Sequence, residues 1–227
     1  MVVDLKMDKL AISVLGKTNS GKGVLLDGLR EHYDGKRKIS ILSLGNTIRQ
    51  IDFSNPFGQE MLSYLKCGMR LPPEAIRDLI HRAAGKLHGD VVFLDGFPPE
   101  YTEKIFGQLP NGMLVLLADN ALCLERSRNR VTCDTCNTTF QKSINLSVGR
   151  NCLKCNGKLE HRCVDTDEIM YTRLETFDKN DAPEIARYEI WLPTCKIKIQ
   201  KETTRQQIND QAVQFLGDTF GFEKILR

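Results

Sequence analysis

Short, nearly continuous runs of apolar residues recur along the chain and predict strands. Four of them are Leu10–Leu15, Ile39–Leu44, Val91–Leu94 and Met113–Ala118. Runs of this kind are typical of parallel strands that are covered by other elements on both faces. Cys195–Gln200 alternates apolar and polar residues instead, which is typical of an edge strand.

Apolar residues between these runs recur at helical spacing. The segments Gly23–His32, Glu74–Leu87 and Arg205–Phe220 each place apolar residues three or four positions apart. Alternating strands and helices predict an α/β fold of three layers with a parallel five-stranded sheet. Trp191, with its neighbours Ile190 and Leu192, is expected to pack in the core beside the last strand.

Two stretches interrupt the alternation and predict inserted sub-domains. Residues 45–73 are helical in character but are cut by glycine and proline, and residues 126–166 are polar and contain four paired cysteines. We expect residues 1–44, 74–125 and 167–227 to form the core into which both stretches are inserted.

The composition is that of an ordinary folded protein. Hydrophobic residues make up 41% of the 227 residues and charged residues 27%, which excludes a disordered or fibrous chain. A net charge of +3 is too small to indicate a nucleic acid or an anionic membrane as partner. The sequence contains no apolar run of about 18 residues, and because its first residues are charged throughout we expect no signal peptide. We expect a cytoplasmic monomer without a membrane or nucleic-acid partner.

A glycine-rich loop follows the first predicted strand and precedes the first predicted helix. Its sequence, Gly-Lys-Thr-Asn-Ser-Gly-Lys over Gly16–Lys22, matches the pattern G-x-x-x-x-G-K. In this context the backbone N–H groups of the loop and of the helix N-terminus point at one anion, and Lys22 reaches the phosphates of a nucleotide. An ordinary glycine turn is the alternative. The residues expected to bind the phosphates are Gly16, Lys17, Thr18, Asn19, Ser20, Gly21, Lys22, Gly23 and Val24.

Four cysteines form two C-x-x-C pairs, Cys133 with Cys136 and Cys152 with Cys155. Pairs of this kind in an intracellular chain indicate a metal site, and four thiolates complete a tetrahedral Zn²⁺ shell. Such a closed shell leaves no open position, so the zinc would be structural and would supply much of the folding free energy of a small insertion. Free thiols are the alternative.

A sequence motif further along the chain resembles a known family. Val91–Pro98 ends a predicted strand with Asp-Gly-Phe-Pro, downstream of a loop of the form G-x-x-x-x-G-K-G. This combination resembles the adenylate kinases and the related nucleoside monophosphate kinases. The resemblance continues in the same order over nearly the whole chain, in the segments Leu42–Arg49, Gly68–Glu74, Leu124–Arg130, Arg162–Asp165 and Arg173–Leu174.

The resemblance implies transfer of the γ-phosphoryl group of ATP, with Mg²⁺, to a nucleoside monophosphate, most simply AMP. It implies that residues 45–73 are a helical insertion that binds the nucleoside monophosphate and that residues 126–166 are a mobile, zinc-binding lid. Transfer of this kind needs positioning, charge neutralisation and exclusion of water more than covalent chemistry.

The resemblance also implies roles for individual residues. The implied catalytic residues are Lys22, Arg126, Arg130, Arg162 and Arg173, of which Arg126 also binds ATP. The residues implied to bind the nucleoside monophosphate are Leu44, Gly45, Arg49, Arg70, Leu71, Gly96, Phe97, Glu103, Arg162 and Arg173. Asp95 is implied to orient Mg²⁺ through water, with helix capping as the alternative role.

The chain departs from the family pattern on its acceptor side. Pro99 stands where the family has an arginine that touches phosphate. Loss of one such donor from a water-poor site costs about 3 kcal/mol of transition-state stabilisation. Arg70 and Arg77 are the candidates to replace it. The other departures are Val24 and Leu44 in place of threonine, Asn46 in place of aspartate and Glu103 in place of glutamine.

The change at Glu103 has a chemical direction. Glutamine both accepts and donates hydrogen bonds and so matches adenine, whereas a carboxylate only accepts. The carboxylate of Glu103 therefore suits a base with two adjacent hydrogen-bond donors, as guanine has. We therefore keep the hypothesis that the acceptor is a nucleoside monophosphate other than AMP.

Two further functions stay open at the level of sequence. The first is a nucleotide-binding pseudokinase or sensor that retains the ATP loop and the lid but has lost efficient transfer. The second is a nucleic-acid-binding zinc protein, which is disfavoured because Phe140 is the only aromatic residue of the cysteine-containing stretch.

Overall fold

The computed structural model describes residues 9–136, 138–161 and 165–222. Five parallel strands form the central sheet in the order β2-β3-β1-β4-β8. Their bounds are β1 (Leu10–Gly16), β2 (Ile39–Ser43), β3 (Val91–Asp95), β4 (Gly112–Ala118) and β8 (Thr194–Ile199). The predicted α/β fold with a parallel five-stranded sheet is confirmed.

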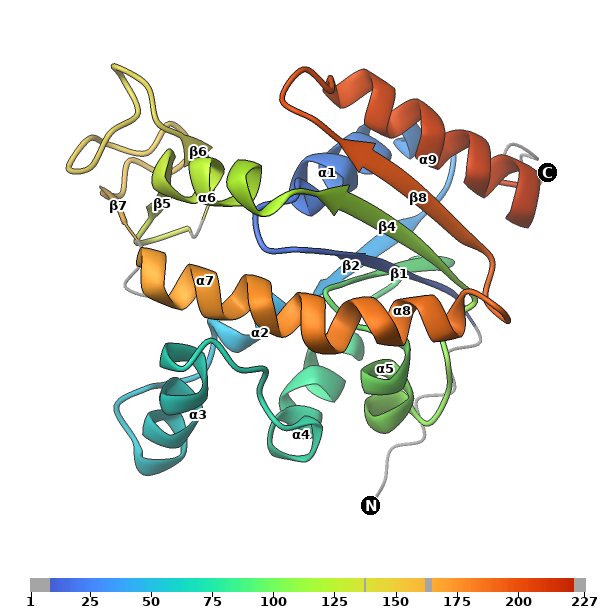
Figure 1. The fold of residues 1–227 in the computed structure, drawn as a ribbon, viewed down its shortest axis with the longest axis horizontal. Helices are drawn as coiled ribbons and strands as arrows, with labels where there is room; N and C mark the ends of the chain where they lie inside the picture. The colour runs from blue at the N-terminus through green and yellow to red at the C-terminus, as the bar shows by residue number, and fades with distance from the viewer. Residues whose placement is uncertain (1–8, 137, 162–164, 223–227) are drawn as a thin grey trace.

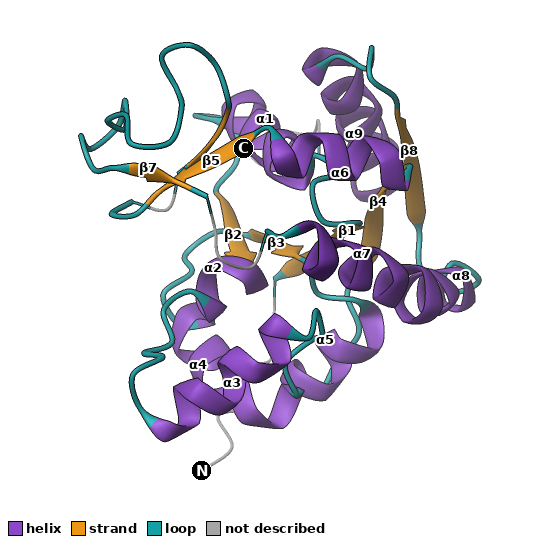
Figure 2. Cartoon of the chain, turned by 60° about the vertical axis from the view of Figure 1, so that its left-hand side comes forward, coloured by secondary structure: helices purple, strands orange, loops and turns teal. Residues whose placement is uncertain are grey.

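Helices cover both faces of this sheet, which makes three layers (Figure 1). One face carries α1 (Lys22–Tyr33) and α9 (Arg205–Phe220). The opposite face carries α4 (Pro73–Ala84), α5 (Pro99–Phe106) and α8 (Ala182–Tyr188). Figure 2 shows the same layers from the side. Because β1 is covered twice, its alternate residues enter different cores. Ile12 and Val14 pack toward α1 and α9, and Ala11 and Leu15 pack on the other side.

The remaining helices surround the carboxyl ends of the strands. Their bounds are α2 (Leu44–Ile48), α3 (Pro56–Lys66), α6 (Asn120–Arg128) and α7 (Asp167–Thr176), with a π-helix, η1 (Phe177–Asp181), between α7 and α8. The strand expected over Ile39–Leu44 ends one residue earlier, because the Ser43 hydroxyl accepts a hydrogen bond from the Asn46 N–H (3.3 Å) and caps α2.

The cysteine-containing stretch folds around a small antiparallel sheet of its own. This sheet has the order β6-β5-β7, with β5 (Arg130–Cys133), β6 (Thr139–Gln141) and β7 (Leu159–Glu160). Its apolar core consists of Val131, Cys133, Cys152 and Leu159, with Phe140 and Leu146 packed against it. So small a core gives little free energy of folding by itself.

The expectation for Trp191 and Ile190 is wrong. Both side chains lie on the surface between α8 and β8, 65% and 75% exposed. Leu192, the third residue of this expected group, does pack beside the strand, against a core cluster that contains Ile185. None of the helices in the described part of the chain combines the length and the apolarity that crossing a bilayer requires.

Candidate nucleotide-binding and phosphoryl-transfer site

The loop between β1 and α1 has the backbone geometry of an anion-binding turn. Gly16 and Gly21 have φ angles of 140° and 110°, and a Cβ atom at Gly16 would lie 2.6 Å from the carbonyl oxygen of Leu116. Asn19 has a φ of 63°, a conformation that asparagine tolerates better than most residues. The loop therefore passes close to β4 and turns directly into α1, in the context that the motif predicts.

Lys22, the first residue of α1, folds back over this loop. Its ammonium group donates hydrogen bonds to the carbonyl oxygens of Gly16 (2.8 Å) and Lys17 (3.0 Å). Burial lowers the pKa of Lys22, and the negative charges of Asp95 and Asp181 oppose this shift. An enclosed cation with carbonyl partners is not neutralised by them, so it is available to an anionic ligand.

Two arginines at the base of the cysteine-containing stretch contact the same loop. Arg126 Nη1 donates to the carbonyl oxygens of Ser20 (3.0 Å) and Asn19 (3.3 Å). Arg130 forms a two-pronged ion pair with Asp165 (2.5 and 2.8 Å) and also donates to the side chain of Asn19. These contacts hold both guanidinium groups close to the phosphate loop.

Arg49 lies at the end of α2, on the other side of the site. It donates to the side chain of Asn46, while its Nε is buried without a described hydrogen-bond partner. Burial lowers the pKa of Arg49, the positive charge of Arg130 adds to this shift, and Asp95 opposes it. The positive charges of Arg49 and Arg130, which come from different elements, therefore repel one another across the site, and the carboxylates of Asp95 and Asp165 offset part of this repulsion.

Asp95 ends β3, in register with Val14 of β1. Its Oδ2 accepts a hydrogen bond from the Ser43 hydroxyl (2.8 Å), and its Oδ1 is buried without a described partner. The next helix, α5, has Pro98 at its N-cap, so Asp95 does not cap that helix. The buried, unpartnered carboxylate oxygen is a suitable partner for a water molecule of a hydrated cation.

A cleft of about 1030 Å³ joins these groups. The residues predicted to bind nucleotide or Mg²⁺ that line it are Thr18, Asn19, Gly21, Lys22, Gly23, Val24, Gly45, Arg49, Asp95, Arg126 and Arg130, and the predicted metal ligand Cys136 lines it as well. The fold thus brings the glycine loop, the acceptor-side insertion and the base of the cysteine-containing stretch to one place. This place is the carboxyl edge of the strands, where ligands bind in open α/β sheets.

Other sequence-predicted residues lie beside the cleft or away from it. Phe97 is fully buried and Leu71 nearly so, which leaves their side chains in the core. Glu103 is exposed on α5 and is not part of the lining. Arg173 is half-buried in the last turn of α7, and its backbone lies against Gly68. Arg162 lies outside the described residues.

Sequence reasoning missed part of the cleft wall. The turn between β8 and α9 contributes Lys201 and Thr203, followed by Arg205 and Ile208 of α9. The sequence did contain a signal for this wall. The turn follows the carboxyl end of a strand that was expected to be parallel to the others, and ligands bind at that end of such strands. Ser43, which holds Asp95, was missed as well.

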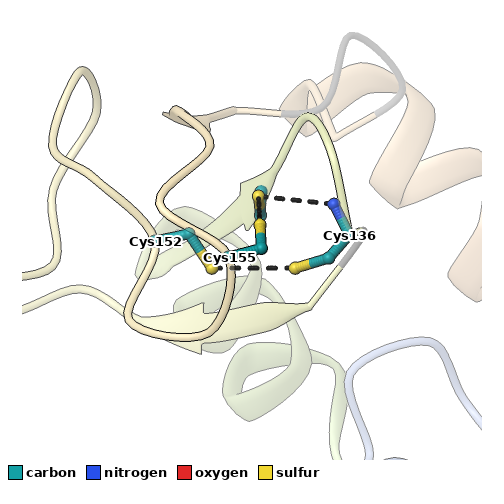
Figure 3. A group of neighbouring side chains, drawn as sticks. Cys136, Cys152 and Cys155 are labelled. Carbon is teal, nitrogen blue, oxygen red and sulfur yellow. Dashed lines mark hydrogen bonds between the residues drawn. The ribbon is translucent and has the colours of Figure 1, made fainter.

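The four paired cysteines come together at the small antiparallel sheet, with Cys133 at the end of β5. Figure 3 shows the other three, Cys136, Cys152 and Cys155, as labelled sticks. Their sulfur atoms all lie within 4.8 Å of one another, with 3.4 Å between Cys133 and Cys155 and 3.6 Å between Cys136 and Cys152. Four sulfurs at the Zn–S distance from one tetrahedral ion are about 3.8 Å apart. The group therefore fits a metal ion such as zinc.

A parallel sheet with a glycine-rich loop between its central strand and the first helix defines a P-loop nucleotide-binding protein. Comparison with curated proteins adds that the chain is 30% identical to an adenylate kinase of Clostridium tetani over 189 residues, 78% of this chain and 86% of the relative. Adenylate kinases of Ruminiclostridium cellulolyticum and Chlamydia muridarum are 29% and 26% identical, over 79% of this chain and 87% and 77% of their own lengths.

The chain belongs to the adenylate kinase family. The resemblance that the motifs indicate is thereby confirmed over most of the chain. No family model matches this sequence. Its departures at positions such as Pro99 and Val24 are in keeping with the low identity to each relative.

Proposed function

We propose that the protein is a nucleoside monophosphate kinase that transfers the γ-phosphoryl group of ATP, with AMP as the first candidate acceptor. The observation that carries the proposal is the convergence of Lys22, Arg49, Arg126 and Arg130 on one cleft over the glycine loop. Phosphoryl transfer depends on cations that neutralise the developing charge, and arginine suits this task because its fork is always charged.

We assign the donor side to the glycine loop with Arg126 and the acceptor side to residues 45–73 with Arg49. Asp95 orients Mg²⁺ through water, and support comes from its buried Oδ1, which has no hydrogen-bond partner among the described residues. Arg130 and Arg173 reach the phosphates when residues 126–166 close as a lid over the core formed by residues 1–44, 74–125 and 167–227. We extend the same role to Arg162 from the family motif alone.

We further propose that Cys133, Cys136, Cys152 and Cys155 hold one structural zinc ion. The distances among the four sulfurs support this assignment. When bound, the ion cross-links the two cysteine turns. The adjoining strand β5 begins with Arg130, so a firm sheet fixes the direction in which that guanidinium points.

A second candidate is a nucleotide-binding relative that has lost transfer and acts as a sensor. It is favoured by Pro99, which is buried at the start of α5 and brings no charge to a position where the family has arginine. Such a protein would bind ATP tightly and form no ADP above background.

A panel of acceptors tests both candidates. Initial rates of ADP formation are measured with ATP and each of AMP, GMP, CMP and UMP, with a Lys22→Met variant as background. We expect turnover at least about a hundred-fold above that background, because loss of one electrostatic contact costs this much. Rates at background with all four acceptors, together with tight ATP binding, would support the sensor instead.

The same panel tests the specificity hypothesis at Glu103. If its carboxylate reads the base, GMP is phosphorylated faster than AMP, because guanine offers two adjacent donors. A clear preference for AMP refutes that hypothesis and leaves the kinase assignment intact.

A further inference from the structure

Arg70 is the most firmly anchored arginine of the acceptor-side insertion. Its Nη2 pairs with Asp181 of η1 at 2.6 Å, and its guanidinium carbon lies 5.2 Å from the ring centroid of Tyr101. Tyr101 in turn donates its hydroxyl to the carbonyl oxygen of Leu71 (2.9 Å), which fixes the chain next to Arg70. The side chain is therefore held in one orientation before any ligand binds.

One donor of this side chain lacks a partner. Arg70 Nη1 is buried and makes no hydrogen bond to any described residue. A buried charged donor without an acceptor is costly, because it loses water and gains nothing in return. Buried groups of this kind call for an explanation, and an anionic ligand at Nη1 supplies one.

Arg70 and the lysine of the glycine loop act electrostatically on the same carboxylate. Burial raises the pKa of Asp181, and the two cations that oppose this shift are Arg70 and Lys22. Arg70 in turn adds to the lowering of the Lys22 pKa, which is caused mainly by burial. Asp181 thus has both cations as electrostatic neighbours, one from the acceptor-side insertion and one from the phosphate loop.

The guanidinium group of Arg70 lies over the ring of Tyr101, a residue of the first turn of α5, which begins with Pro99. Tyr101, beneath Arg70, comes two residues after Pro99. Arg77, the other candidate cation, is directed elsewhere, since its Nη2 donates to the carbonyl oxygen of Lys104 (2.8 Å) in the last turn of α5. Of these two arginines, Arg70 therefore contacts a side chain of the first turn of α5, and Arg77 contacts the last turn.

We propose that Arg70 is a catalytic residue that binds the phosphate of the acceptor through Nη1, and that Asp181 is a positioning residue that holds it. This inference rests on the proposed function. In the transfer step an oxygen of the acceptor phosphate forms a bond to the γ-phosphorus of ATP, while the bond to the β,γ-bridging oxygen breaks and ADP leaves with the electron pair. Arg70 neutralises the acceptor phosphate as the two anions approach.

Equilibrium binding by zinc-loaded full-length protein tests this assignment without any need for turnover. The probes are AMP and adenosine, which differ only in the phosphate. We expect Arg70→Met to weaken AMP binding by about 10- to 100-fold, the range for a charge-assisted hydrogen bond, and to leave adenosine binding within twofold. Arg77→Met is the matched control and leaves both affinities within twofold.

Rates and conservative variants separate contact from structure. Arg70→Met is expected to lower kcat/KM for the acceptor by about a hundred-fold or more with little change in the KM for ATP. Arg70→Lys recovers part of this loss, because it keeps the charge but not the fork. Asp181→Asn releases Arg70 and weakens AMP binding by less than Arg70→Met does, again without an effect on adenosine.

The outcomes are distinct from those of the acceptor panel. If Arg70→Met weakens the binding of AMP and of adenosine equally, Arg70 has a structural role and the assignment is overturned. Unchanged AMP binding in this variant would also overturn it. A wild-type protein without transfer activity overturns the proposed function, whereas the comparison of AMP with adenosine still decides whether Arg70 binds the phosphate.

Discussion

Replacing Lys22 with methionine is expected to lower kcat by about a hundred- to a thousand-fold. Methionine keeps the length and the apolar stem of lysine but removes the charge. The lost interaction is the one between the ammonium group and the transferring phosphoryl group, which is stronger in the transition state than in the ground state. The measurement is the initial rate of ADP formation at saturating ATP and acceptor.

The same variant is expected to be as stable as the wild type or more so. Burial lowers the pKa of Lys22, and Arg70 adds to this shift, so the charged form is held at a cost to folding. Removing the charge removes that cost, while two hydrogen bonds to loop carbonyl oxygens are lost. Lys36, exposed just after α1, provides the control variant Lys36→Met, with unchanged kcat. A Lys22→Met protein with full activity would remove Lys22 from the catalytic site.

Removal of zinc is expected to unfold the small sheet formed by β5, β6 and β7 and to abolish most of the activity. Four buried residues form its core, so burial alone cannot compensate the entropy of ordering about 40 residues. Structural zinc contributes roughly 10–16 kcal/mol of folding free energy in zinc-finger peptides, which is enough to offset the part of this entropy that burial leaves uncompensated. Hydrogen exchange is the direct measurement, with loss of protection over β5 to β7 and retention over β1 and β4.

Variants distinguish the metal from a general role of cysteine. Cys136→Ser is expected to lower the zinc content from one ion per chain and the melting temperature by at least about 5 °C, since a few kcal/mol shift a chain of this size by that much. Cys67→Ser, at an exposed thiol outside the cluster, should change neither. A zinc-free protein with an unchanged melting temperature and full protection over β5 would contradict the structural role.

Most of the central fold followed from local pattern. Apolar runs such as Met113–Ala118 have the length of a strand and are too short for a helix. They therefore predicted the bounds of each strand of the parallel sheet within one or two residues. The glycine loop was found because strand, loop and helix follow one another in sequence. The cysteine cluster was found because C-x-x-C spacing directs two thiolates to one point.

Contacts between distant segments could not be predicted in this way. Arg70 and Asp181 are 111 positions apart, and nothing in either neighbourhood indicates the ion pair that joins them. Which of Arg70 and Arg77 replaces the missing arginine depends on the end of α5 that each side chain contacts, the Tyr101 ring for Arg70 and the Lys104 carbonyl for Arg77. Periodicity in the sequence does not determine these contacts. Trp191 was misassigned because a large apolar residue beside a strand is usually buried, whereas here Ile185 and Leu192 fill the space.

The decisive measurement is a crystal structure with a bisubstrate dinucleotide, in which donor and acceptor nucleosides are joined through their phosphates. We expect the guanidinium groups of Arg49, Arg126 and Arg130 and the ammonium group of Lys22 to lie about 3 Å from phosphate oxygens above the glycine loop. Arginine side chains directed away from the phosphates, or a dinucleotide bound outside the cleft, would contradict it.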